Sequence, residues 1–403
     1  MSRIPPQRLL TARAFPEDPG ADAAGRLERF LREYWGRAAL ELRGVLGDFE
    51  VPLDADELAG LACEPDADAR IVRREGEGFV VEQGPFEPER FDSLGDADWT
   101  LLVNAVDLAL PGFEPLLEAV RFVPDWRLDD IMVSFAAPGG SVGPHFDRYD
   151  VFLLQAAGTR RWELGARPDG DDRRRSHADG LDLVTGFAPD EVVRCGPGDG
   201  LYVPPGLVHH GIAETPCLTL SLGFRSPALP ELVSDWVLAA ADEMPDAPLD
   251  LDPELPADPA LLDDRTLELA RARLRAQLLE TLDGQDDAAF AGWLGELLSR
   301  SGRHARFDAS DSITPTALAA ELEAGAALER APGLRLLLRP ATGGTLVFAG
   351  GERFPCPLPP EALAPFTRLA PLHREDLREP AALELAAALF DAGRMILVDP
   401  DGA

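Results

Sequence analysis

Alternating hydrophobic and polar positions in the first half of the chain predict a β-rich unit. Residues 149–155 (YDVFLLQ) are β-branched and aromatic, as in a buried strand. Residues 160–164 alternate with period two, which places Arg160 and Trp162 on one face of a strand and Arg161 on the other. A short apolar strand at 201–203 lies between a Gly-Asp turn and a Pro-Pro bend. Short strands separated by such turns predict a barrel.

Helical spacing appears before and after this unit. Leu27, Phe30, Leu31 and Tyr34 predict a helical lead-in. A proline- and aspartate-rich stretch at 242–259 is typical of a linker or a long loop. Two amphipathic helices are then predicted. The first is indicated by Leu267, Leu274 and Leu278 at helical spacing, and the second by the run AAFAGWLGELLSR at 288–300. Such a pair commonly buries its apolar face against a partner, although packing within the chain would satisfy it equally.

The last hundred residues predict a separate α+β unit. Thr314-Pro315 forms an N-cap with proline in the first helical position. A β-hairpin is predicted around Gly343-Gly344, followed by a helix at 381–393 and a strand at 394–400. Helices followed by a hairpin suggest a winged helix. The chain has 403 residues, which is longer than a single hydrophobic core usually supports. We therefore predict three regions. Their boundaries are 1–225 for the barrel with its lead-in, 226–304 for the helical region, and 305–403 for the winged-helix-like domain.

The segment His145-Phe146-Asp147 carries the strongest chemical signal. A histidine and a carboxylate two positions apart on an extended strand face the same side, and a histidine from a later strand can complete a 2-His-1-carboxylate set. That set occupies one side of an octahedral Fe(II) and leaves positions open for a co-substrate and O2. The third ligand is either His209 or His210 in PPGLVHHG, and spacing alone does not choose. We expect His177, His304 and His373 to be solvated or structural.

Arg160 is the second candidate group. Its predicted face is otherwise apolar, with Trp162 and Leu164, and a guanidinium in such surroundings is costly unless it meets an anion. Its planar fork suits a carboxylate bidentately. We therefore expect Arg160 to hold the distal carboxylate of a dicarboxylic co-substrate, with pairing to a nearby Asp or Glu as the alternative.

Several motifs, in order, resemble the bacterial ribosomal oxygenases of the JmjC type. They run from WRLDDIMVSFAAPGGSVGPHFDRYDVFLLQAAGTRRWELG through PGDGLYVPPGLVHHGI to LSLGFRSP, and FLREYWGRAALELRG and WTLLVNAVDL resemble the family's N-terminal portion. The resemblance implies an α+β protein: a double-stranded β-helix (jelly-roll or cupin) barrel, then a helical dimerisation region, then a winged-helix-like domain. It also implies a homodimer.

The same resemblance implies the site and the reaction. His145, Asp147 and His209 would hold Fe(II), Arg160 would bind the C5 carboxylate of 2-oxoglutarate, and Thr219 and Ser221 would lie on the co-substrate side. With O2, the enzyme would be a 2-oxoglutarate-dependent dioxygenase that hydroxylates the β-carbon of an arginine in a large-subunit ribosomal protein. Four residues near the motifs are candidates for lining the substrate groove: Asp130, Ser141, Tyr149 and Asp150.

Three alternatives stay open. The first is a histidyl hydroxylase of a ribosomal protein, since eukaryotic relatives in the family modify histidine. The second is a cupin metalloenzyme that does not use 2-oxoglutarate, which would not need Arg160. The third is a binding module that has lost catalysis, against which the complete ligand set His145, Asp147 and His209 argues.

Composition narrows the function classes further. The chain has no lysine, which excludes Schiff-base chemistry and a phosphate-binding P-loop lysine. Asp and Glu number 71 against 38 arginines, for a net charge of −33, which would attract a basic protein and repel nucleic acid, although a proteome-wide bias gives the same numbers. The winged-helix-like region also has an acidic excess, so we expect no DNA binding there. Four dispersed cysteines favour reduced thiols, and no segment resembles a signal peptide or membrane span, so we expect a cytoplasmic protein.

Overall fold

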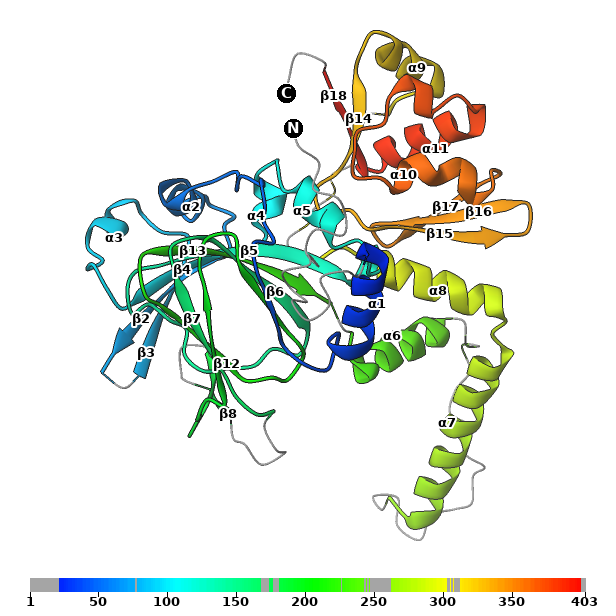
Figure 1. The fold of residues 1–403 in the computed structure, drawn as a ribbon. Helices are drawn as coiled ribbons and strands as arrows, with labels where there is room; N and C mark the ends of the chain where they lie inside the picture. The colour runs from blue at the N-terminus through cyan, green and yellow to red at the C-terminus, as the bar shows by residue number, and fades with distance from the viewer. Residues whose placement is uncertain are drawn as a thin grey trace.

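The structure is a computed structural model, and it describes most of the chain. The described residues are 22–76, 78–167, 174–176, 181–225, 227–242, 244, 246, 262–302, 305, 307 and 312–399. Figure 1 shows a β-barrel with helices on its outside, a group of helices beyond it, and a small mixed unit that contains the C-terminus. The predicted α+β class is confirmed, whereas most of the linker prediction at 242–259 lies outside the described residues, as do His177 and His304.

Two antiparallel sheets form the barrel, as the spacing of short strands predicted. The larger sheet contains, in spatial order, β1 (Leu40–Leu42), β11 (Gly200–Val203), β6 (Asp150–Ala157), β13 (Cys217–Phe224), β5 (Leu128–Ala136), β4 (Trp99–Val103), β2 (Ala69–Glu75) and β3 (Gly78–Gln83). The smaller sheet contains β10 (Glu191–Cys195), β7 (Arg160–Leu164) and β12 (His209–Ala213), and β8 (Arg174–Ser176) pairs with β9 (Asp182–Val184). The predicted alternation in β7 is confirmed, because Arg160, Trp162 and Leu164 are buried while the residues between them are partly exposed.

Short helices cover the outer face of the larger sheet. They are α1 (Ala23–Glu33), α2 (Ala55–Leu61), α3 (Glu89–Asp92), α4 (Val106–Ala109), α5 (Glu114–Ala119) and the 3-10 turn η2 (Asp125–Arg127). The lead-in helix α1 begins at Asp22, whose carboxylate accepts the backbone N–H of Gly25. It anchors to the sheet through Phe30, which is fully buried and packs edge-on against Tyr202 with ring centroids 4.9 Å apart.

The two predicted helices of the middle region are present, and a third precedes them. They are α6 (Leu229–Asp242), α7 (Asp264–Gly284) and α8 (Asp287–Ser299). Trp236, Phe290 and Trp293 pack together between α6 and α8, with ring centroids 5.3–5.9 Å apart. Figure 1 shows α7 extending away from the rest of the molecule. Its apolar side chains remain accessible, and Leu274 is 63% exposed.

The C-terminal unit has its own hydrophobic core, which is rich in leucine and includes buried side chains of α9, β15, β16 and α11. Its elements are α9 (Pro315–Glu323), β14 (Ala327–Arg330), β15 (Leu336–Ala341), β16 (Gly344–Ala349), β17 (Glu352–Cys356), η3 (Pro360–Leu363), α10 (Ala364–Thr367), η4 (Arg374–Asp376), α11 (Pro380–Asp391) and β18 (Met395–Val398). The predicted cap is present, because the Thr314 hydroxyl accepts the N–H of Ala317. The predicted hairpin turns at Gly343 and Gly344, both with positive φ.

The cysteines are free, as their spacing predicted. No helix among the described residues is both long and apolar enough to cross a membrane.

Candidate metal centre

His145, Asp147 and His209 come together at one end of the barrel. His145 and Asp147 lie in the segment between β5 and β6, so the prediction that they belong to the strand itself is wrong. His145 instead forms an isolated antiparallel bridge with His209, the first residue of β12, through reciprocal backbone hydrogen bonds of 3.1 and 2.8 Å. This bridge sets two of the three side chains directly opposite one another.

The three side chains present their ligand atoms to a common point. One nitrogen or oxygen from each lies within 4.8 Å of the other two, and His209 Nε2 is 3.6 Å from Asp147 Oδ2. The imidazole rings of His145 and His209 lie 4.3 Å apart between centroids. Two histidines and one carboxylate within this distance form a donor set suited to Fe(II) with open positions.

Backbone carbonyls fix which nitrogen of each histidine is available. Nδ1 of His145 lies 2.9 Å from the carbonyl oxygen of Gly143, and Nδ1 of His209 lies 3.1 Å from that of Leu207. A carbonyl only accepts, so each Nδ1 carries the proton and each Nε2 keeps a lone pair for a metal. Burial, together with the neighbouring His145, lowers the pKa of His209 to about 4, so its imidazole is neutral at physiological pH.

The ambiguity between the two adjacent histidines is resolved by β12. His209 is buried beside Trp162 of the neighbouring strand β7, with ring centroids 6.0 Å apart. His210 points to the opposite face, where its Nδ1 lies 3.1 Å from Glu163 Oε2. The structure therefore brings His209, and not His210, to the other two ligands. His373 precedes η4 in the C-terminal unit, outside this cluster.

Arg160 is buried behind the metal ligands without an acidic partner among the described residues. It is 4% exposed, and its Nη1 donates to the hydroxyls of Ser134 and Thr219, each at 3.2 Å. Its Nε has no hydrogen-bond partner, and burial lowers the pKa of the guanidinium. The predicted alternative, pairing with a nearby carboxylate, is thus wrong. A buried guanidinium with unused donors fits a ligand carboxylate.

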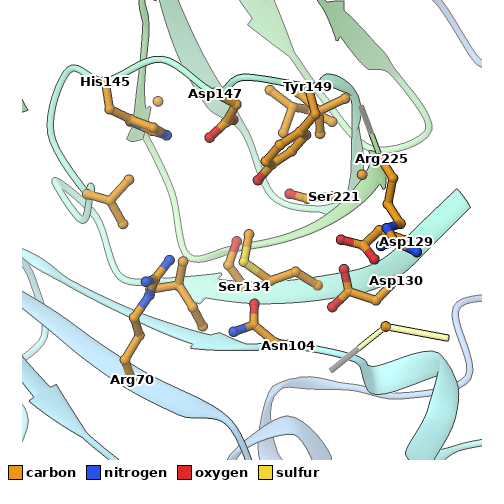
Figure 2. A pocket seen from close by; sticks show the side chains of 18 of the residues that line it. Arg70, Asn104, Asp129, Asp130, Ser134, His145, Asp147, Tyr149, Ser221 and Arg225 are labelled. Atoms are coloured by element: carbon orange, nitrogen blue, oxygen red, sulfur yellow. The ribbon is translucent and has the colours of Figure 1, made fainter. Parts of the chain in front are cut away.

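Thr219 and Ser221 occupy different places relative to the cavity. Ser221 lies on its wall (Figure 2). Thr219 supports Arg160 from behind, because its hydroxyl accepts from Arg160 and donates to Gln155 Oε1 at 3.1 Å. Gln155 was not singled out by the sequence, although its amide in an otherwise apolar strand was a signal.

A cavity of about 560 Å³ lies in front of these residues. In Figure 2 its polar side chains are divided between two ends, with His145 and Arg70 on one side and Asp129, Asp130 and Arg225 on the other. Tyr149 projects between them from the segment before β6.

Two of the four predicted groove residues line this cavity, and two do not. Asp130 and Tyr149 are on its wall. Ser141 is buried elsewhere, with its hydroxyl accepting the N–H of Gly143 at 3.0 Å. Asp150 is also buried, and it accepts hydrogen bonds from the Tyr202 hydroxyl, the Gly36 N–H and Arg127. Its carboxylate therefore ties the lead-in segment to the sheet, and its prediction as a groove residue is wrong.

The C-terminal unit contributes to the same cavity, which the sequence did not indicate. Ala305 and Gly333 are on its wall, next to Ser301 and Gly302 from the segment that follows α8. Arg335, 5% exposed, donates to the carbonyl oxygens of Leu128 at 3.0 Å and Arg300 at 2.6 Å and to Asp129 Oδ1 at 3.1 Å.

Comparison with known proteins agrees with this geometry. The JmjC domain family matches residues 115–232, the ROXA-like winged helix matches residues 277–394, and an AraC-like ligand binding domain matches residues 187–314. The ribosomal protein uL16 3-hydroxylase of Escherichia coli is 35% identical over 374 residues, which cover 90% of this chain and 95% of that protein. The chain belongs to the JmjC ribosomal oxygenase family.

Other relatives support this membership. A probable ribosomal oxygenase of Haemophilus influenzae is 34% identical over 259 residues, 64% of this chain and 63% of that protein. The structure of an Escherichia coli ribosomal oxygenase in complex with cobalt and 2-oxoglutarate matches with a TM-score of 0.75 and 34% identity, over 92% of this chain and 98% of that chain. As a JmjC ribosomal oxygenase, this protein uses Fe(II) and 2-oxoglutarate, and the donor set and buried guanidinium described above fit both groups. The predicted winged-helix-like domain is confirmed.

Proposed function

We propose that this JmjC ribosomal oxygenase hydroxylates the β-carbon of an arginine side chain in a basic protein of the large ribosomal subunit. The observation that carries the proposal is the placement of two adjacent carboxylates, Asp129 and Asp130, on the cavity wall away from His145 (Figure 2). A guanidinium that enters between Tyr149 and this wall meets the charge it requires. The relative named a ribosomal protein uL16 3-hydroxylase supports the choice of substrate.

In this proposal each residue of the centre has a distinct role. His145, Asp147 and His209 hold Fe(II) through two Nε2 atoms and a carboxylate oxygen. Bound Fe(II), 2-oxoglutarate and O2 supply the oxidising chemistry, with succinate and CO2 as co-products. Arg160 binds the distal carboxylate of 2-oxoglutarate, Thr219 positions Arg160, and Ser221 lies beside the co-substrate. Trp162 covers one face of the Arg160 guanidinium, 5.1 Å from its ring centroid, and helps to exclude water.

The acidic end of the cavity would orient the substrate. Asp130 Oδ2 accepts the backbone N–H of Ala105 at 2.8 Å, which fixes its carboxylate, and Asp129 is held by Arg335. The β-carbon of an arginine lies at the opposite end of the side chain from its guanidinium. Binding the guanidinium at these carboxylates therefore presents carbons nearer the main chain to the metal ligands.

The deciding experiment is incubation of the purified protein with Fe(II), 2-oxoglutarate, O2 and overlapping peptides of large-subunit ribosomal proteins. We expect one added oxygen on an arginine peptide, located at the β-carbon by fragmentation, and none on the same peptide with lysine at that position. Oxygen on a histidine peptide alone would establish the histidyl alternative. Arginine oxidation without succinate would instead favour a cupin enzyme that does not use 2-oxoglutarate.

We also propose a homodimer formed through α6 and α7. Leu229, Leu238 and Leu274 are 76%, 68% and 63% exposed, and such apolar surface is expected to be covered by a partner. Light scattering should give twice the chain mass for the wild type and one chain mass for Leu274→Glu. An unchanged dimer in that variant would place the interface elsewhere.

Two further expectations follow from a ribosomal substrate. The net charge of −33 favours contact with a basic protein over nucleic acid, and the winged-helix unit would accordingly contact protein. Such a substrate would also place the enzyme in the cytoplasm.

A further inference from the structure

Arg70 lines the cavity, and within the described ranges no side chain or backbone group is paired with its guanidinium. It lies on β2, and its Nε is buried with no hydrogen bond. Across the part of the chain that the structure describes, its side chain forms neither a hydrogen bond nor an ion pair, although acids outnumber arginines by 71 to 38. Arg70 is half-buried, and a buried guanidinium nitrogen without an acceptor is costly, so this side chain is expected to meet an acceptor from a ligand in the cavity.

The strand register places Arg70 on the same face of the sheet as the Arg160 anchor. Arg70 is directly opposite Leu102, Leu102 is opposite Ser134, and Ser134 is opposite Thr219. Directly opposed residues project to the same side of a sheet, and neighbouring strands are about 4.8 Å apart. The Arg70 backbone is thus about 10 Å from that of Ser134, on the side toward the β3 edge.

Apart from Arg160, which is assigned to the co-substrate, two other arginines that lie on or beside this cavity are bound to protein groups. Arg225 donates to the carbonyl of Arg300 at 3.0 Å, and Arg335 is held at three points. Arg73, on the same strand as Arg70, pairs with Glu82 at 2.8 Å and Glu75 at 3.1 Å. The protein therefore supplies carboxylates to β2 outside the cavity and leaves the arginine inside it available.

We propose that Arg70 binds an oxygen acceptor of the substrate polypeptide, a main-chain carbonyl or a carboxylate, next to the residue that is modified. The proposal rests on the function proposed above only in requiring that a polypeptide enters the cavity. The cavity presents Asp129 and Asp130 at one side and Arg70 at the other (Figure 2). A cationic side chain directed to the acids leaves the flanking chain, which carries the acceptors, on the side of Arg70.

The test measures binding of fluorescein-labelled overlapping peptides of ribosomal protein uL16 to the full-length protein by anisotropy, with Mn²⁺ in place of Fe(II) so that no turnover occurs. Arg70→Met should raise the peptide Kd about tenfold to hundredfold, since hydrogen bonds to charged groups contribute about 1.5–3 kcal/mol. Arg70→Lys should recover part of this affinity. Arg73→Met removes a charge from the same strand outside the cavity, and should leave the Kd within about twofold.

Peptide variants identify the acceptor. If it is a carboxylate, replacing the acidic residues of the peptide by their amides should weaken binding to the wild type but not further weaken binding to Arg70→Met. If it is a main-chain carbonyl, those replacements should leave the effect of Arg70→Met unchanged.

Unchanged peptide affinity in Arg70→Met would overturn the proposal. If that variant also bound 2-oxoglutarate more weakly than the wild type, Arg70 would be assigned to the co-substrate instead. Because Arg70 has no hydrogen-bond or ion-pair partner among the described residues, the melting temperature of Arg70→Met should equal that of the wild type, and this verifies that the variant is folded. Peptide binding without oxygen addition in the Fe(II) enzyme would overturn the hydroxylase function and leave the role of Arg70 standing. Failure of the wild type to bind any of the peptides would overturn both.

Discussion

Replacing Arg160 by methionine should separate co-substrate binding from folding. In the unliganded protein the Arg160 guanidinium is buried with only two hydroxyl partners and an unsatisfied Nε. Methionine removes the buried charge and loses two hydrogen bonds of about 1 kcal/mol each, so the free energy of unfolding should stay within about 2 kcal/mol of the wild type. The variant is thus expected to fold.

The loss of 2-oxoglutarate affinity should be much larger. Removing one partner of a buried ion pair costs about 3–5 kcal/mol, because the remaining charge stays desolvated. At about 1.4 kcal/mol per factor of ten, the Kd for 2-oxoglutarate should rise by roughly two to three and a half orders of magnitude. Ligand at a hundred times its Kd stabilises the wild type by about 2.7 kcal/mol, which corresponds to a rise of about 5–10 °C in Tm for a barrel of this size.

The assay is a thermal melt with Mn²⁺ across a series of 2-oxoglutarate concentrations. Arg160→Met should show no shift at concentrations that saturate the wild type. Arg161→Met is the matched control, because Arg161 is the next residue on β7 but points outward to Glu163 and Glu214. A full ligand-induced shift in Arg160→Met would refute the assignment of Arg160 to the co-substrate.

Three further outcomes are expected. Thr219→Val removes one hydrogen bond from Arg160 and one from Gln155 Oε1, so calorimetry should show the Kd for 2-oxoglutarate rising about tenfold, whereas an unchanged value would limit Thr219 to packing. His209→Gln should lose stoichiometric metal by elemental analysis while His210→Gln keeps it, and the reverse result would contradict the tautomer argument. Burial raises the pKa of Asp107 to about 7, so the native state retains a proton that the unfolded chain releases near pH 4. The free energy of unfolding therefore falls as the pH rises from about 4 to 7. In Asp107→Asn the decrease in the free energy of unfolding between about pH 4 and pH 7, measured from denaturation curves, should be smaller than in the wild type by about 2–4 kcal/mol. An equal pH dependence in both proteins would argue against the raised pKa.

Local periodicity was sufficient to predict the barrel strands that carry the centre. In β7 the alternation placed Arg160 on the same face as the apolar Trp162 and Leu164, because side chains on a strand must alternate between its faces, and that apolar face is the buried one. The same rule left His209 and His210 undecided, since it separates the two faces without indicating which one is inside. Their environment decides: β12 pairs with β7, and His210 lies opposite Glu163 on the outer face.

Nearness in sequence was a poor guide to the substrate groove. Tyr149 and Asp150 are adjacent, yet only Tyr149 lines the cavity. Asp150 begins β6, where consecutive side chains point to opposite faces, and it is buried beside Tyr202. The H-x-D ligands required no regular strand, because a single bridge to His209 aligns the backbone at the one position where alignment matters.

The contribution of the C-terminal unit to the cavity depends on pairing that no local pattern specifies. Arg335 lies between Leu334 and Leu336 at the start of an apolar strand, which signals a buried charge but not its partner. That partner, Asp129, is 206 residues away, in a chain with 71 acidic residues. By holding Leu128 and Asp129 together with Arg300, one guanidinium links the start of β5 to the end of α8. The position of an acidic group on the cavity wall is thus determined by the winged-helix unit, so this unit is part of the structure that shapes the centre even though it supplies none of its metal ligands.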